Sequence, residues 1–503
     1  MDKGGFLLPR KIPIFYSALL LTGVNLLLRF VGTSFQVYLS GRIGAEGIGL
    51  LQLTMSVGGL AMVAGMGGIR TATMYLTAEE LGKGRSHTIT QILSGCIGYS
   101  MIFSIVTGCF LYHFAPWIAE LWIGNIYTTD ALQLFASFLP VVCLCGVMTG
   151  YFTAAQRIGT LAVIEVAEQL CSMILTILLL NFWAGHDPVR SCLSVILGSS
   201  FGAVLTLCTF LILRLLEKPA IGKPIPLQDR LLKIALPLAL ADDLKAGINT
   251  TENLMVPKRL ALNQATSNPL ASFGMVSGMV FPVIMFPAAI LFGLTELLIP
   301  EMARCNSASI STRIQYLTRK SLKVALIYSI TFGGLLFLLS DWLCMRLYGS
   351  LDAANHLRWY ALLIPMLYCD AITDAITKGL GQQYICVRYN IVTSILDVVF
   401  LYFLLPRWGM QGYFISFFIT HLLNFILSLR LLLHTTGLTL PVTVSLMSIT
   451  SMGCGIFAAM WTNTPVTTGL SYLAILFCLL FLSGVLQQKD LCWIHGLIGQ
   501  KSC

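Results

Sequence analysis

Apolar stretches of roughly 20 to 30 residues follow one another along almost the whole chain, with short polar breaks between them. A helix of about 20 apolar residues spans the hydrocarbon core of a bilayer, which is about 30 Å thick. Apolar residues fill 56% of the 503 positions and charged residues only 11%, whereas a soluble domain carries about 25% charged residues. The chain is therefore predicted to be an all-α polytopic membrane protein.

The apolar runs between polar breaks predict about 14 transmembrane helices. Their ranges are 12–39, 48–77, 88–112, 128–150, 158–182, 190–214, 231–256, 270–299, 314–340, 355–378, 384–406, 409–433, 439–460 and 465–487. With a cytoplasmic N-terminus, 21 basic residues fall in inside segments and 7 in outside segments. That bias follows the positive-inside rule. We expect both termini to be cytoplasmic, in the bacterial plasma membrane, with no cleaved signal peptide.

A charged, proline-containing segment suggests how the chain is divided. Residues 219–230 hold Pro219, Pro224 and Pro226, which keep a helix from continuing through them. The predicted parts are an N-terminal lobe of six helices, a cytoplasmic linker, a C-terminal lobe of six helices, and two additional helices with a cytoplasmic tail. Their ranges are 1–218, 219–230, 231–433 and 434–503.

The two predicted lobes repeat a glycine spacing. Gly49 opens the second span and Gly274 the eighth, and Gly68 and Gly293 each follow nineteen residues later. This register aligns the first span with the seventh. An even number of helices in each repeat would give the lobes the same orientation, related by an axis along the membrane normal.

Several polar side chains interrupt the predicted spans. A basic residue at the bilayer centre costs about 2.5–3.5 kcal/mol on insertion scales, so such residues normally face water or a partner. The predicted ligands of a substrate cavity between the lobes are Arg29, Arg70, Lys245, Asn25 and Gln36. Arginine suits a phosphate because its planar fork makes bidentate contacts.

Acidic residues accompany these cations. The predicted cavity acids are Asp242, Asp243, Glu252 and Glu296. The alternative for the seventh span is an internal ion pair between Lys245 and Asp242 or Asp243, which would only neutralise buried charge.

Asp370 and Asp374 lie one turn apart in the tenth span and are the candidates for coupling transport to H⁺ or Na⁺. The alternative is a structural pair between Asp374 and Lys378, one turn further on. No metal-ligand cluster, nucleotide-binding loop or catalytic motif is predicted, so we expect neither a cofactor nor an enzyme. The basic residues lie at helix ends without interleaved aromatics, and we expect no nucleic-acid partner.

One region resembles a known family. It comprises Arg29-Phe-Val-Gly32, the stretch from Arg42 through Gly44-Ala45-Glu46-Gly47-Ile48-Gly49 to Leu50, and Gly67-Gly68-Ile69-Arg70-Thr71-Ala72. These residues resemble the N-terminal signature of the stage V sporulation protein B family. That family is part of the polysaccharide transporter branch of the multidrug/oligosaccharidyl-lipid/polysaccharide flippase superfamily.

The resemblance implies two six-helix lobes in a V-shaped arrangement, two extra helices, and flipping of undecaprenyl-linked saccharides. It matches Arg29 to the first arginine of the family motif. The second motif arginine is replaced by Gln36, and Arg70 stands where proline is common.

We expect a flippase for a polyprenyl-diphosphate-linked saccharide used in cell-wall, spore-cortex or surface-polysaccharide assembly, working as a monomer in the bilayer. One rival is a cation-coupled multidrug antiporter of the same superfamily. A cavity lined by arginines would disfavour its cationic substrates. A membrane-embedded glycosyltransferase or polymerase is the third hypothesis, and the short predicted outer loops argue against it.

Overall fold

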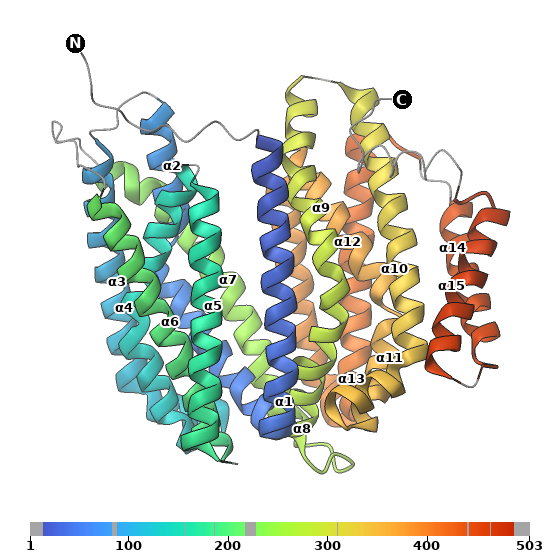
Figure 1. The fold of residues 1–503 in the computed structure, drawn as a ribbon, viewed down its shortest axis with the longest axis horizontal. Helices are drawn as coiled ribbons and strands as arrows, with labels where there is room; N and C mark the ends of the chain where they lie inside the picture. The colour runs from blue at the N-terminus through green and yellow to red at the C-terminus, as the bar shows by residue number, and fades with distance from the viewer. Residues whose placement is uncertain are drawn as a thin grey trace. The chain divides into compact units, whose positions relative to one another are not determined.

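A computed structural model describes residues 14–82, 88–155, 157–185, 187–216, 228–308, 310–439, 442–462 and 464–486. Every regular element in these ranges is a helix, and they contain no strand. Figure 1 labels the main helices in chain order. The all-α prediction is confirmed.

The main helices are α1 (Ile14–Met66), α2 (Ile69–Gly82), α3 (Ile89–Ile118), α4 (Thr129–Ala154), α5 (Ile158–Leu179), α6 (Pro188–Leu216), α7 (Gln228–Leu260), α8 (Pro269–Met275), α9 (Phe281–Ser307), α10 (Ser311–Tyr348), α11 (Leu351–Ala361), α12 (Ile364–Gly379), α13 (Gln383–Thr436), α14 (Val442–Ala459) and α15 (Pro465–Leu482). Short π-helical turns extend three of the spans at η2 (Ala119–Ile123), η4 (Leu180–Ala184) and η5 (Val276–Val280), and η3 (Ile126–Thr128) is a 3₁₀ turn.

Two helices are far longer than a bilayer is thick, and each is bent at a glycine. The 53 residues of α1 and the 54 of α13 would each extend about 80 Å if straight. Gly44 in α1 has φ +71° and Gly409 in α13 has φ +57°, in the left-handed region that glycine adopts without steric cost. Each bend divides its helix into two arms, so each of these helices supplies two of the predicted passes.

Nine helical segments within the described ranges are long and apolar enough to cross a membrane. The number rises to ten if α11 and α12, bent by 53° to each other, form one broken span. α7 is not among them because its charged residues lower its hydropathy, and the apolar part of α14 is shorter than a full span. Of the five spans by which nine differs from the predicted 14, two are lost because α1 and α13 each count once, two are α7 and α14, and one is the bent pair α11 and α12.

The chain packs into two compact units. One contains Met1–Gly278 and Val398–Met410, and the other contains Met279–Asp397 and Gln411–Cys503. Packing thus groups α7 and α8 with the first unit, whereas the sequence analysis starts the second lobe at residue 231. The predicted linker lies almost wholly outside the described residues.

Small residues explain why α7 and α8 pack within the first unit. A Cβ added to Gly274 of α8 would lie 2.1 Å from the carbonyl oxygen of Ala45, and one added to Gly68 would lie 2.5 Å from that of Ala235. No side chain fits at these distances. The backbones of α1 and α8, and of the α1–α2 break and α7, therefore touch directly, as small residues allow at membrane helix crossings.

Each unit has its own apolar cores. In the first unit a core joins α2, α3, α4, α6 and α7, with Ile69, Phe152 and Phe210 at most 1% exposed. In the second unit one core joins α9, α10, α12 and α13, and another joins α10 to α14 and α15 (Figure 1). The extra C-terminal helices are thus anchored on α10.

Candidate functional site

Arg29 and Arg70 of the first unit lie on apolar helices with exposed side chains. The neighbourhoods of both include one helix, α5. A Cβ on Gly32, one turn after Arg29, would lie 3.3 Å from Gln169 Nε2, and the charge of Arg70 interacts with that of Glu165. Glu165 and Gln169 are one helical turn apart, so they share a face of α5. This polar face therefore borders α1 one turn from Arg29 and interacts with Arg70.

The polar face of α5 continues toward α6. Glu168 accepts a hydrogen bond from Thr206 Oγ1 at 2.8 Å, and it is half-buried like Glu165. The sequence analysis assigned neither glutamate a role. The signal that could have found them is their occurrence as isolated acids in an apolar span, where an unpartnered charge is costly.

Arg70 follows a break in the backbone between α1 and α2. Gly67 and Gly68 have φ +50° and +69°, and the Tyr99 hydroxyl donates to the Gly67 carbonyl at 3.1 Å. The break starts a new helix, α2, with Arg70 as its second residue. The predicted second span is therefore two helices, and the arginine lies at the junction between them.

Asp242, Asp243 and Lys245 lie near the middle of α7 in the same unit. Asp243 is half-buried, and its charge interacts electrostatically with Tyr99. Its buried Oδ1 accepts no hydrogen bond from any described residue. Asp242 and Lys245 are exposed. Within the described ranges Lys245 forms no ion pair with either aspartate, so the internal-pair alternative does not describe this structure.

Nearer its C-terminal end, α7 is bound to α1. Asn253 Nδ2 donates to Ser56 Oγ at 2.9 Å and Thr250 Oγ1 donates to the Ser56 carbonyl at 3.1 Å, while Glu252 between them is half-buried. These hydrogen bonds join α7 to the second arm of α1 within the first unit. They also position the helix that carries Asp243.

Gln36 has a structural contact that the sequence analysis did not foresee. Its Nε2 donates to the Gly278 carbonyl at 3.1 Å, in the π-helical turn η5, where the regular helix ladder is interrupted. One of its side-chain donors therefore satisfies the backbone. The side chains of Asn25 and Glu296 lie outside the described residues; their backbones are helical, in α1 and α9.

The two acids of the predicted ion-coupling pair, in α12 of the second unit, have different partners. Asp374 Oδ2 pairs with Lys378 Nζ at 2.5 Å, which is the structural alternative. Asp370 Oδ2 instead accepts from Asn424 Nδ2 at 3.0 Å, and its Oδ1 is buried without a hydrogen-bond partner in the described part of the chain. Asp370 is thus the acid of this pair with an unused buried oxygen.

A third acid of the second unit, Asp397, was given no role. It is only 4% exposed, and its Oδ1 accepts from Ser416 Oγ at 2.6 Å and Thr420 Oγ1 at 3.1 Å. The charge of Asp397 also interacts electrostatically with His421 and Tyr360. A carboxylate so deeply buried within hydroxyl groups suits an exchangeable cation or proton.

Comparisons with known proteins agree with this architecture. The model of the family described as polysaccharide biosynthesis protein matches residues 15–240. Stage V sporulation protein B of Bacillus subtilis (strain 168) is 21% identical over 407 residues, which is 78% of each chain.

Two groups of solved structures share the fold. Lipid II flippase MurJ in an inward closed conformation has a TM-score of 0.68 and 15% identity, over 94% of this chain and 100% of that one. An inward-facing multidrug resistance MATE family transporter of the MOP superfamily also has a TM-score of 0.68, with 12% identity over 83% of this chain and 98% of that one.

The helical fold and these matches define a polytopic membrane protein whose fold is shared with the flippase MurJ and with the MATE family transporter. In sequence the chain is similar to stage V sporulation protein B and, over residues 15–240, to the polysaccharide biosynthesis protein family, which confirms the resemblance seen in its N-terminal signature.

Proposed function

We propose that this protein is a flippase that carries a polyprenyl-diphosphate-linked saccharide across the bacterial plasma membrane by alternating access. The observation that supports the proposal is the pair of exposed arginines in the first unit: Arg70, which interacts with Glu165 of α5, and Arg29, one turn from the point where Gly32 of α1 meets Gln169 of α5. Two guanidinium groups on apolar helices suit a diphosphate, whose oxygens accept bidentate hydrogen bonds. The saccharide would serve cell-wall, spore-cortex or surface-polysaccharide assembly.

Glu165 has a place in this proposal. Its negative charge interacts with that of Arg70, and a diphosphate arriving at Arg70 would compete with it for that guanidinium. A partner exchange of this kind keeps the arginine from holding the headgroup too tightly. Moderate affinity lets the headgroup leave on the far side of the membrane. A substrate that bound the two conformations of the protein equally tightly would not shift the protein from one to the other.

Coupling to H⁺ or Na⁺ is proposed at the buried acids of the second unit. Asp370 has an unused buried carboxylate oxygen, and Asp397 is surrounded by hydroxyl groups. Oxygen ligands of this type suit a hard cation, and a proton would equally neutralise the buried charge. Asp374 is left out because Lys378 already neutralises it.

The test is to substitute Arg29 and to measure, in each variant, both substrate flipping and the amount of protein in the membrane. If Arg29 holds a diphosphate, Arg29→Ala stops headgroup exposure at the outer face without lowering the amount of protein in the membrane. Arg29→Lys restores only part of the activity, because a point charge cannot reproduce the bidentate fork. Arg190→Ala is the control, since that arginine is also exposed but pairs with Asp187 at a helix start. Full flipping by well-folded Arg29→Ala would refute the assignment.

A cation-coupled multidrug antiporter is the second candidate. The half-buried acids Glu165, Glu168 and Asp243 favour it, because carboxylates attract cationic drugs, and the MATE transporter matches the fold as well as the flippase does. Efflux of a cationic dye by the reconstituted protein decides between them. Dye efflux that survives Arg29→Ala and is lost in Glu165→Gln would establish the antiporter instead.

A further inference from the structure

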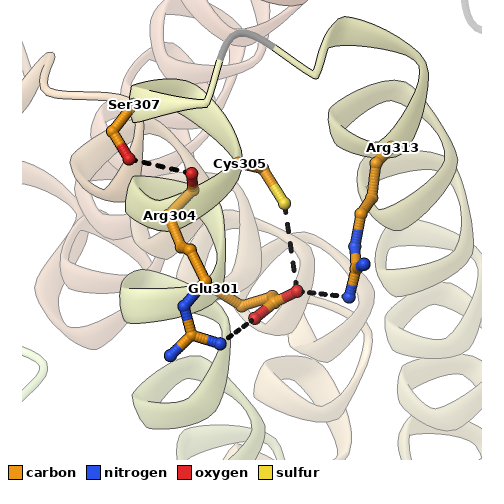
Figure 2. Close-up of polar contacts among 5 residues, drawn as sticks. All are labelled: Glu301, Arg304, Cys305, Ser307 and Arg313. Atoms are coloured by element: carbon orange, nitrogen blue, oxygen red, sulfur yellow. Dashed lines mark hydrogen bonds and ion pairs between the residues drawn. The ribbon is translucent and has the colours of Figure 1, made fainter.

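The turn between α9 and α10 in the second unit carries a fixed arrangement of charges. Glu301 Oε1 pairs with Arg313 Nη2 at 2.6 Å and Oε2 with Arg304 Nη1 at 3.3 Å. Figure 2 shows the two arginines approaching the same carboxylate from α9 and from α10. Both remain accessible, with side chains 72% exposed for Arg304 and 58% for Arg313, whereas Glu301 is 25% exposed.

Each arginine keeps donors beyond those that Glu301 uses. A guanidinium group has five N–H donors, and the contacts with Glu301 use one nitrogen of each. The carboxylate therefore orients two exposed guanidinium groups without covering them. Such an arrangement is preorganised for an anion with several oxygens, since less side-chain entropy is lost on binding.

The length of α10 places this end of the helix beyond the hydrocarbon. Its 38 residues extend about 57 Å, nearly twice the core thickness. Residues 324–340 contain no charge, and residues 311–323 contain Arg313, Arg319, Lys320 and Lys323 without an acid. The first three turns of α10 therefore stand in the headgroup region.

The exposed side chains on these turns have one chemical character. Arg313, Tyr316 and Arg319 are exposed and three residues apart, so they lie on neighbouring positions of the same side of α10. Tyrosine is enriched at membrane interfaces. The first turn of α10 has no acidic residue and no side-chain cap, which adds to the positive potential. We call Arg304, Arg313, Tyr316 and Arg319 the basic turn surface.

We propose that the basic turn surface binds the headgroup of an anionic glycerophospholipid in the cytoplasmic leaflet, with Arg304 and Arg313 contacting the phosphate. Charge complementarity favours this occupant, because the surface faces the headgroup layer and each basic residue there attracts anionic lipid. The site is separate from the arginines of the proposed substrate path. It therefore does not depend on whether the chain is a flippase or an antiporter.

The experiment measures lipid binding to the purified full-length protein, with no transport involved. Phosphatidylglycerol and phosphatidylcholine are titrated in detergent and counted by native mass spectrometry. We expect phosphatidylglycerol to bind at least fivefold more tightly, and each of Arg304→Gln and Arg313→Gln to weaken its binding about fivefold. Arg190→Gln, an exposed arginine of the first unit, is the matched control and leaves binding unchanged. Equal binding of the two lipids to the unaltered protein overturns the proposal.

Glu301→Gln separates an oriented site from simple positive charge. The substitution makes the surface more positive but releases both arginines. An oriented site predicts at least threefold weaker phosphatidylglycerol binding, whereas unspecific attraction predicts stronger binding and would refute the proposal. Farnesyl diphosphate provides the last arm. Displacement of phosphatidylglycerol by equimolar farnesyl diphosphate, dependent on Arg313, would assign the surface to a polyprenyl-diphosphate substrate and overturn the lipid assignment.

Discussion

Asp370 and Asp374 are one turn apart on α12, yet their surroundings differ in kind. Asp374 is neutralised by Lys378 four residues later, a contact that helix periodicity alone makes predictable. Asp370 depends on Asn424 from a distant part of the chain and keeps a buried oxygen without a partner in the described residues. The two carboxylates are therefore not equivalent.

This difference predicts opposite outcomes for the same substitution. Asp370→Asn should abolish the dependence of transport on the ion gradient while substrate still binds, because the neutral amide no longer exchanges a proton or cation. Asp374→Asn, its matched control, should keep that dependence. Transport into proteoliposomes with and without an imposed gradient measures both. Unchanged gradient dependence in Asp370→Asn would leave that residue a structural role only.

Residue-level prediction worked where the partner is local and failed where it is remote. The charged positions themselves could be found, because a charge in an apolar run is conspicuous. The neighbours Glu165 of Arg70 and Ser416 of Asp397 could not, since they come from other helices or from beyond the bend at Gly409. Gln36 was assigned to substrate, but one of its donors serves the backbone of η5.

Among the helices, Tyr472 of α15 contacts both α10 and α14. The Tyr472 hydroxyl donates to the Ile330 carbonyl at 2.7 Å, and the ring fits beside glycines of two helices. A Cβ on Gly334 of α10 would lie 2.0 Å from the tyrosine oxygen, and one on Gly455 of α14 would lie 3.1 Å from its ring. The ring therefore occupies a slot that only glycine leaves open.

Filling that slot should loosen the helix pair. Gly334→Ala is expected to destabilise the second unit by about 1–3 kcal/mol, as overpacking of a close contact does. Gly453→Ala on α14 is the control, because a Cβ there meets nothing within 4 Å. Thermal unfolding in detergent compares the two variants. A lower midpoint for Gly453→Ala than for Gly334→Ala would contradict the role of the slot.

Hydropathy predicted where helices lie but not where they break. The ranges 12–39 and 48–77 anticipated the two arms of α1, yet the second arm stops at Met66 and α2 restarts at Ile69. Gly65, Gly67 and Gly68 stand close together there, and only the backbone shows which of them takes a positive φ. Similarly, the range 355–378 proves to be two helices, α11 and α12.

At the scale of the whole chain, two of the repeated glycines prove to be neighbours in space. Gly49 and Gly274, which the repeat pairs with each other, are in contact: a Cβ on Gly274 would lie 2.5 Å from the Gly49 nitrogen. Both glycines belong to the first unit, so the glycine spacing marks a close crossing of α1 and α8 there, and the repeat that begins at the first and seventh spans stays a prediction.

Orientation in the membrane is the last property that the charge pattern predicts. α10 crosses once, so its ends lie on opposite sides, and its basic residues gather at the end near Lys320.

In a cysteine-depleted variant, Lys320→Cys should react with a membrane-impermeant thiol reagent only after the cells are opened. Ser350→Cys, just past the other end of α10, should react in intact cells. Lys83→Cys, outside the described residues, should behave like position 320. Because position 320 lies on α10 and position 350 just past its other end, a labelled 350 and a protected 320 cannot arise from a misplaced span elsewhere. Labelling of position 350 from the cytoplasmic side alone would reverse the predicted topology, and with it the leaflet assigned to the basic turn surface.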